Sequence, residues 1–164
     1  MQVLNHRQVN QKIKRLAIQI LERNTTEPEI ILAGINNNGL HFAQLIANEL
    51  IAFSEKPVRL TQVKLNPANP LASDIVFEMP LEQINGKSII LVDDVANSGR
   101  TLFYAVKPLL TILPKKIETA VLVDRKHKSF PIVVSYYGIS LATTLQENIK
   151  VSLQDETNLA AFLQ

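Results

Sequence analysis

The amino-acid sequence predicts a single α/β domain with a mainly parallel sheet. The chain has 164 residues, 46% of them hydrophobic, which suits one domain with one buried core. Short runs rich in β-branched residues alternate with longer segments of helical periodicity, a pattern typical of βαβ units with right-handed crossovers. No repeat or linker interrupts the chain, so we expect residues 1–164 to form one domain.

The first half of the chain predicts two helices and two strands. A helix between Arg7 and Arg23 is indicated by apolar residues at helical spacing, namely Val9, Ile13, Leu16, Ala17, Ile20 and Leu21. The run 30–35 predicts a strand and the polar segment 36–39 a loop. A second helix is then marked by Phe42, Leu45, Ile46 and Leu50, and the alternating residues Val58, Leu60, Val63 and Leu65 predict an extended segment.

Residues 66–74 are expected to form an exposed, mobile loop, because Pro67, Pro70 and several turn-forming residues oppose regular structure. After a turn at Asn85-Gly86, the run 88–92 is typical of a strand buried on both faces. We expect this strand to end at the acids Asp93 and Asp94. The remaining predictions are a helix over 99–113, a buried strand over 117–123, short strands at 132–136 and 149–153, and a final helical turn through Leu159 and Phe162.

Composition narrows the function classes. The absence of cysteine excludes a disulfide framework, a thiolate nucleophile and a cysteine-ligated metal, and it fits a cytoplasmic protein. No apolar run approaches the ~20 residues that span a bilayer, so we expect no membrane partner. A net charge of +2 is too small to indicate nucleic acid by itself. The histidines His6, His41 and His127 are too widely spaced to predict a metal triad.

The segment 93–101 is the main candidate for chemistry. Two adjacent acids follow a buried strand and lead into the small polar loop 97–101, at the sheet edge where ligands bind in open α/β folds. Gly99, the backbone N–H groups and the hydroxyls of Ser98 and Thr101 suit a phosphate, while carboxylates accept hydrogen bonds from sugar hydroxyls. The polar clusters 36–39 and 124–128 follow other strand ends and should converge on the same crevice. A purely structural alternative is a pair of solvated acids followed by an ordinary helix cap.

The stretch from Ile89 to Thr101 resembles the phosphoribosyl-pyrophosphate signature of type I phosphoribosyltransferases. The resemblance covers nearly the whole chain, and within the family it is greatest to the bifunctional pyrimidine-operon attenuation regulators and uracil phosphoribosyltransferases; it extends to the segments 20–24, 34–35, 120–127 and 136–138. It implies the type I fold, a mainly parallel twisted sheet flanked by helices with a small hood. It also implies a homodimer or a higher assembly.

The activity that this resemblance implies is transfer of the 5-phosphoribosyl group of phosphoribosyl pyrophosphate to a nucleobase, uracil in the first place, with release of pyrophosphate. Asp93 and Asp94 would form the catalytic pair and hold the ribose hydroxyls. The 5′-phosphate would be bound by Asn97, Ser98, Gly99, Arg100 and Thr101, and the pyrophosphate by Asn37, Asn38 and Gly39. Loop 66–74 would be the lid, and Mg²⁺ would be held mainly by substrate oxygens, so no protein metal site is expected.

Asp124, Arg125 and Tyr136 are the nucleobase candidates by the same resemblance. Each has a structural alternative. Asp124 and Arg125 suit a salt-bridged strand end, and Tyr136 suits a core position on a short strand.

Three features depart from the family. The segment 37–39 has asparagines where relatives carry a basic residue, and losing one charged contact to a leaving group costs about 2–4 kcal/mol of transition-state stabilisation. The lid 66–74 contains no Lys or Arg, and Lys64 is the nearest cation. Asn97 stands where purine enzymes of the family have an aspartate, which favours a pyrimidine substrate or none.

These departures keep two other hypotheses open. The chain is also compatible with a catalytically weak or inactive regulator that senses phosphoribosyl pyrophosphate or nucleotides and binds RNA. Its basic face would come from Lys12, Lys14, Arg15, Lys115, Lys116 and the segment 125–128. The remaining alternative is an unrelated function in the same crevice, since a fold does not dictate a function.

Overall fold

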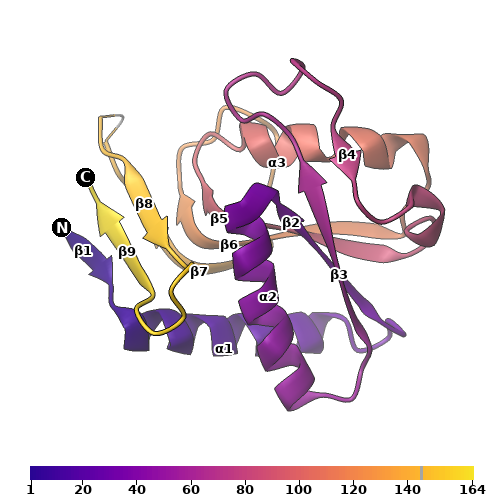
Figure 1. Cartoon of the computed structure of the whole chain (residues 1–164), viewed down its shortest axis with the longest axis horizontal. Helices are drawn as coiled ribbons and strands as arrows, with labels where there is room; N and C mark the ends of the chain where they lie inside the picture. The colour runs from indigo at the N-terminus through magenta and orange to yellow at the C-terminus, as the bar shows by residue number, and fades with distance from the viewer. Residues whose placement is uncertain (145) are drawn as a thin grey trace.

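The computed structural model describes residues 1–144 and 146–164 and confirms the α/β class (Figure 1). Its larger sheet has the strand order β4-β3-β2-β5-β6-β7, and every neighbouring pair is parallel except β3 with β4. The strands are β2 (Ile30–Ile35), β3 (Val58–Lys64), β4 (Val76–Phe77), β5 (Ser88–Ala96), β6 (Lys116–Arg125) and β7 (Tyr136–Leu141).

Helices cover both faces of this sheet. α1 (His6–Arg23) and α2 (Asn36–Phe53) pack on one face, while α3 (Arg100–Ala105) and the 3₁₀ segment η2 (Lys107–Thr111) pack on the other (Figure 1). A second 3₁₀ segment, η1 (Leu81–Gln83), precedes β5. Alternate residues of β2 enter opposite cores, with Ile30 and Leu32 on one side and Ile31 and Ala33 on the other. This explains why the strand reads as a continuous apolar run.

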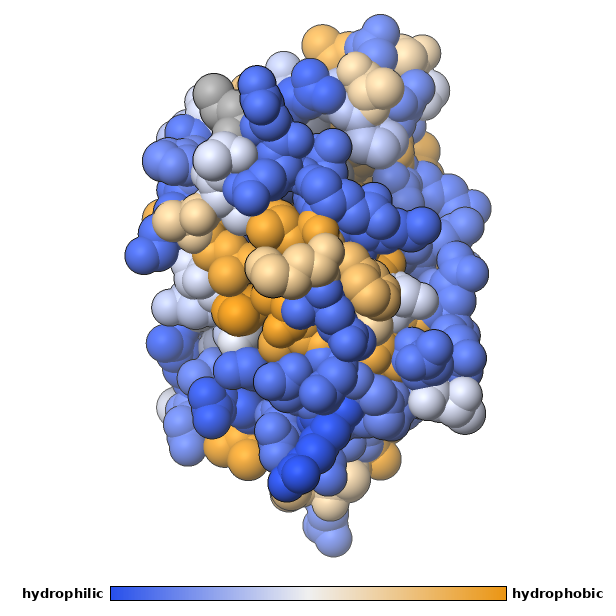
Figure 2. Space-filling model, turned by 90° about the vertical axis from the view of Figure 1, so that its left-hand side faces the viewer, coloured by the Kyte–Doolittle hydropathy of each residue, from blue (hydrophilic) through white to orange (hydrophobic). Residues whose placement is uncertain are grey.

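A smaller antiparallel sheet of order β1-β9-β8, which we call the hood, is made by β1 (Gln2–Leu4), β8 (Ile149–Ser152) and β9 (Ala160–Leu163). Ile149 and Val151 pack against the core that contains α1 and α2. In Figure 2 the side of the molecule that bears this sheet faces the viewer, and apolar side chains gather there within a hydrophilic surround. The hood therefore joins the two ends of the chain beside the main sheet.

Most predicted elements are confirmed, but two boundaries near the crevice were wrong. The polar segment 36–39 is the first turn of α2 rather than a loop, and Asn36 at its start has a φ of 51°. The strand β5 does not end at the acids but runs on to Ala96, because β6 continues to pair with it beyond Asp93.

Three predictions in the second half were also wrong. The expected helix over 99–113 is two short pieces, because Pro108 lacks the N–H that a continuous helix needs. β7 begins at Tyr136 instead of ending there, and the final helical turn is the strand β9. None of the helices in the described residues is long and apolar enough to cross a membrane.

Candidate functional site

The candidate site lies where the parallel strands β3, β2, β5 and β6 end side by side. The first turn of α2 follows β2, and the segment 93–101 begins within β5. They enclose a cavity of about 400 Å³ whose lining includes Asn36, Asn37, Asn38, Pro67, Asp93, Asp94, Asn97, Thr101 and Ile149. The structure thus brings the predicted acids and asparagines together.

A small cavity of about 40 Å³ adjoins it and is lined by Asp93 and residues 95–102. Its floor is a tight turn. Gly99 has a φ of 85°, and a Cβ added there would lie 2.3 Å from the Ile132 side chain. Behind the turn, the Ser98 carbonyl accepts hydrogen bonds from the N–H groups of Ser129 (2.9 Å) and Phe130 (3.2 Å). The segment after β6 therefore fixes the path of this loop, which we call the cradle (residues 97–101).

The two acids, Asp93 and Asp94, lie near the end of β5 and are joined by a hydrogen bond. The Asp94 N–H donates to Asp93 Oδ1 at 2.9 Å, and Asp94 accepts from the Val95 N–H at 2.9 Å and from the Asn38 amide at 3.3 Å. Burial, together with the neighbouring Asp94 carboxylate, raises the pKa of Asp93 well above its usual range. A site that makes an ionised carboxylate this unfavourable attracts cations and hydrogen-bond donors.

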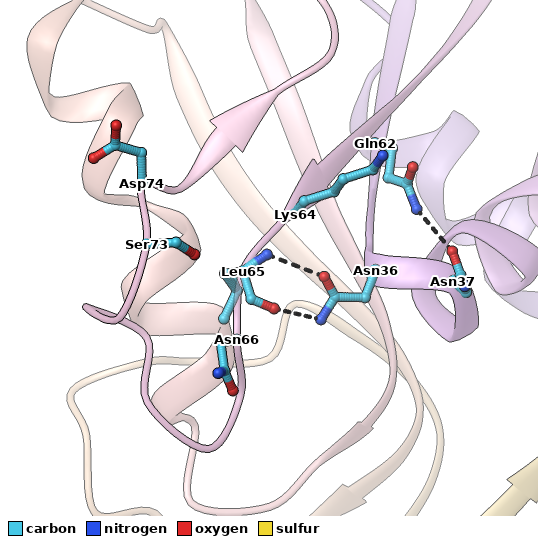
Figure 3. A pocket seen from close by; sticks show the side chains of 8 residues that line it. All are labelled: Asn36, Asn37, Gln62, Lys64, Leu65, Asn66, Ser73 and Asp74. Atoms are coloured by element: carbon cyan, nitrogen blue, oxygen red, sulfur yellow. Dashed lines mark hydrogen bonds between the residues drawn. The ribbon is translucent and has the colours of Figure 1, made fainter.

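A further cavity of about 510 Å³ lies on the other side of the α2 start, and Figure 3 shows its lining. The Asn36 side chain pairs with the backbone of Leu65, donating to its carbonyl at 2.9 Å and accepting from its N–H at 3.0 Å. Gln62 donates to Asn37 Oδ1 at 3.3 Å, and Lys64 extends beside them from the same strand (Figure 3).

Gln62 and Lys64 line the candidate site and were not among the sequence candidates, although Lys64 was noted as the nearest cation. The parallel register pairs Ile35 with Val63, so Lys64 lies level with Asn36. Their place at the end of a predicted strand was the available sequence signal. It could have been used only if the pairing of β3 with β2 had been known.

Gly39 has a role in packing. It is buried, and an added Cβ would lie 2.4 Å from the Val92 carbonyl oxygen. Only glycine lets the first turn of α2 approach β5 this closely. Asn37 and Asn38, by contrast, are exposed.

Asp124 and Arg125 end β6 beside the cradle. Arg125 donates from its guanidinium to Asn97 Oδ1 (3.2 Å), Thr143 Oγ1 (2.6 Å) and the Thr144 carbonyl (2.7 Å). Asp124 forms an ion pair with Lys128 at 2.6 Å. Asp124 therefore forms the salt bridge at a strand end that was its structural alternative. Arg125, in contrast, contacts Asn97, which lines the 400 Å³ cavity.

Tyr136 is not in the crevice. It is 1% exposed, and its hydroxyl donates to Glu118 at 2.9 Å and accepts from the Asn24 amide at 3.2 Å. Burial and the Glu118 carboxylate raise the pKa of its hydroxyl. It pairs with Ala120, near the middle of β6, while the cradle lies beyond the end of that strand. The assignment of Tyr136 to the nucleobase was wrong, because the ring is enclosed in the core.

The hood supplies one more wall. A cavity of about 370 Å³ lies between the α2 start and β8, lined by Asn38, Asp94 and residues 149–154. No cluster of three or more His, Cys, Asp or Glu suited to a metal occurs in the described residues. The carboxyl oxygens of Asp93 and Asp94 are the type of ligand that Mg²⁺ prefers, so they fit an ion completed by substrate oxygens.

Comparisons with known proteins agree with this geometry. Residues 1–155 match the model of the phosphoribosyl transferase domain. The chain is 33% identical to the bifunctional protein PyrR of Streptomyces coelicolor, over 94% of this chain and 83% of that protein. It is 31% identical to the bifunctional protein PyrR of Bacillus pumilus, over 99% of this chain and 96% of that protein.

Solved structures show the same fold. The hypoxanthine phosphoribosyltransferase of Trypanosoma cruzi superposes with a TM-score of 0.79 at 16% identity, covering 98% of this chain and 95% of that one. A hypoxanthine-guanine phosphoribosyltransferase of Bacillus anthracis gives 0.70 at 22% identity, covering 85% of this chain and 81% of that one. With its acid pair and cradle at the carboxyl end of a parallel sheet, the chain belongs to the phosphoribosyltransferase family of type I fold.

Proposed function

We propose that this protein transfers the 5-phosphoribosyl group of phosphoribosyl pyrophosphate to a pyrimidine base, uracil, and releases pyrophosphate. The observation that carries the proposal is the joining of two cavities at Asp93, one lined by the acid pair and the other by the cradle. A ribose 5-phosphate needs acceptors for its hydroxyls beside donors for its phosphate, and these cavities offer both.

In this proposal Asp93 and Asp94 accept hydrogen bonds from the ribose 2′- and 3′-hydroxyls. The cradle N–H groups and the hydroxyls of Ser98 and Thr101 surround the 5′-phosphate. Anchoring both ends of the sugar fixes C1 relative to the leaving group and the base, and such positioning supplies much of the rate in reactions with an oxocarbenium-like transition state. The raised pKa of Asp93 supports the role, because its ionised form gains most from a nearby positive charge.

Mg²⁺ bound to the substrate would neutralise charge on the departing pyrophosphate. Asp93 and Asp94 would orient the hydroxyls that share this ion. Asn37 and Asn38 would donate to pyrophosphate oxygens through neutral amides. Lys64, which lines the cavity next to Asn37, is the residue we assign to supply the positive charge that the asparagines lack.

A pyrimidine is supported by Asn97, which stands where purine enzymes of the family have an aspartate and which lines the 400 Å³ cavity. Asn97 presents an amide there, and Arg125 holds it. The relatives named bifunctional protein PyrR point to pyrimidine metabolism through the resemblance described above.

The test is pyrophosphate release from phosphoribosyl pyrophosphate with uracil, cytosine, hypoxanthine and guanine in turn. Release with uracil well above the other bases is the expected result. The absence of turnover with every base, at high protein and Mg²⁺ concentration, would refute the catalytic proposal. The variant Asp93→Asn with Asp94→Asn is the matched negative control.

A regulatory function is the second candidate, and the neutral asparagines at the pyrophosphate side favour it. An exposed hollow on α1, lined by Lys14 and Arg15 together with Glu22, brings two basic side chains together away from the crevice. RNA held by this surface should bind more weakly as salt rises, because counterion release drives such contacts. RNA binding that is absent, or unchanged by Lys14→Gln with Arg15→Gln, would exclude this version.

A further inference from the structure

The lid, residues 66–74, is contacted by a cationic side chain from outside it, that of Arg100. Residues 66–74 include no Lys or Arg. The Arg100 guanidinium nevertheless donates to the Pro67 carbonyl at 2.6 Å and to the Ala68 carbonyl at 3.5 Å. Arg100 is the first residue of α3, so a residue of the cradle holds the start of the lid.

A second anchor lies just before the lid. Asn36 pairs with both backbone groups of Leu65, and the Asn66 side chain accepts from the N–H groups of Ala68 (3.0 Å) and Asn69 (3.3 Å). The start of the lid is thus a compact turn fixed at one end by α2. Arg100 supplies the contact at the other end, while residues 71–74 are exposed.

In this position the start of the lid forms part of the wall of the crevice. Pro67 lines the 400 Å³ cavity together with Asp93 and Thr101, and Arg100 lines the adjoining 40 Å³ cavity. The Arg100 N–H also donates to Ser98 Oγ at 3.3 Å, so this residue belongs to the cradle through its backbone and to the lid through its side chain. A change in the cradle can therefore affect the lid through Arg100, and a change in the lid can affect the cradle.

We propose that Arg100 is a positioning residue that latches the lid over the crevice, and that a phosphate in the cradle strengthens this latch. A guanidinium has five N–H donors, and in the described part of the chain only its Nη2 has partners. The Nε and Nη1 groups have no hydrogen-bond partner in the described part of the chain, so they remain available to a phosphate dianion in the cradle while Nη2 stays bonded to the lid carbonyl. The 5′-phosphate then holds the lid more firmly in the position that the structure already shows, which keeps water from the reacting carbon. This coupling rests on the function proposed above.

The experiment is amide hydrogen exchange of the full chain, with and without saturating ribose 5-phosphate. It compares the wild type with Arg100→Gln, Arg100→Lys and the control Lys107→Gln, an exposed lysine on η2 with no ion pair among the described residues. In the free protein, Arg100→Gln should raise exchange at Ala68, Asn69 and Ala72 roughly tenfold, since one charge-assisted hydrogen bond is lost. Arg100→Lys should rescue part of this protection, and Lys107→Gln should match the wild type.

Ribose 5-phosphate should further protect the amides of Ala68, Asn69 and Ala72 in the wild type and not in Arg100→Gln. Equal lid exchange in wild type and Arg100→Gln would overturn the latch. A raised exchange in Arg100→Gln without any ligand effect in the wild type would overturn the coupling to phosphate. Calorimetry separates this from the proposed function: if wild type binds no ribose 5-phosphate the function fails, whereas binding with an Arg100-independent lid defeats only the latch.

Discussion

Arg125 and Asn97 are joined by a hydrogen bond of 3.2 Å from the guanidinium Nη1 to the amide Oδ1. Because a guanidinium can only donate, the amide oxygen must face Arg125, and the amide N–H₂ is left for another acceptor. Arg125 also holds Thr143 and Thr144, which precede the hood. One side chain thus connects the cradle to the chain that leads into β8.

Replacing Arg125 should therefore weaken binding of the base more than binding of the sugar phosphate. We expect Arg125→Ala to lower the affinity for uridine 5′-monophosphate by about tenfold, the effect of one lost charged hydrogen bond. Affinity for ribose 5-phosphate should change by less than threefold, and calorimetry measures both. Lys126→Ala, at an exposed neighbour, is the control. An equal loss for the two ligands would show that Arg125 serves the cradle alone.

Asp93→Asn should stabilise the protein at neutral pH. The raised pKa of Asp93 means that its contribution to folding is fully present only below the unfolded pKa, about 4, and is lost as the pH rises through the folded pKa. The variant has no such loss, so its melting temperature should exceed that of the wild type by an amount that grows as the pH rises from about 4 toward the raised pKa of Asp93. Asp74→Asn, in the exposed lid, should show no such trend. A constant difference across this range would contradict the assigned cause.

The same Asp93→Asn variant should bind ribose 5-phosphate at least tenfold more weakly, because an amide accepts fewer hydrogen bonds from hydroxyls than a carboxylate does. The greater stability expected of this variant would exclude unfolding as the reason for the loss. Calorimetry at pH 7.5 measures the affinity, and affinity equal to that of the wild type would remove Asp93 from the ribose site.

Lys64→Gln should slow pyrophosphate release by about ten- to a hundredfold at saturating substrate, since no basic residue of the segment 37–39 replaces its charge. Asn38→Arg should recover much of this rate in the Lys64→Gln background. Steady-state release of pyrophosphate is the measurement, with Lys14→Gln on α1 as the control. If Lys64→Gln keeps the full rate, the charge must come from elsewhere.

Tyr136→Phe should lower stability by about 1 kcal/mol and leave the affinity for uridine 5′-monophosphate unchanged. The hydroxyl that is removed hydrogen-bonds Glu118 and Asn24, while Lys116 continues to pair with Glu118 at 3.2 Å. Denaturant unfolding and calorimetry separate the two effects. A specific loss of nucleotide affinity would return this ring to the base site.

The sequence was sufficient for the elements whose pattern is local. The apolar run of β2 and the helical spacing of α1 decide their own structure, and the cap of α1 is local too, because Asn5 and Gln8 bond each other reciprocally at 3.0 and 2.9 Å. The acid pair and the cradle were predicted as a site from residue type and from their place near the carboxyl end of a strand, and the structure places them around one crevice. The resemblance to the phosphoribosyltransferase family was recognised from the same stretch of sequence.

The break at Pro108 was a local signal that was overlooked, whereas the other errors discussed here arise where segments distant in the sequence decide the structure. Acids are depleted in strands, so only pairing with β6 shows that β5 continues through Asp93. The spacing of Leu159 and Phe162 suits a helical turn equally well, and it is pairing with β1 and β8 that makes β9 a strand. Tyr136 was misplaced because its sequence neighbours do not reveal the Asn24 and Glu118 partners that enclose it.

At the α2 start, the backbone path and the charge depend on different residues. Gly39, which lies against the Val92 carbonyl, determines the path. The path of this turn is fixed, since any side chain at residue 39 would collide with β5. Residues 37 and 38 are exposed, and their charge can be exchanged without repacking the core. Single substitutions at residues 37 or 38 can therefore lower or restore the affinity for a polyanion. On this fold, an enzyme and a sensor can differ by few substitutions.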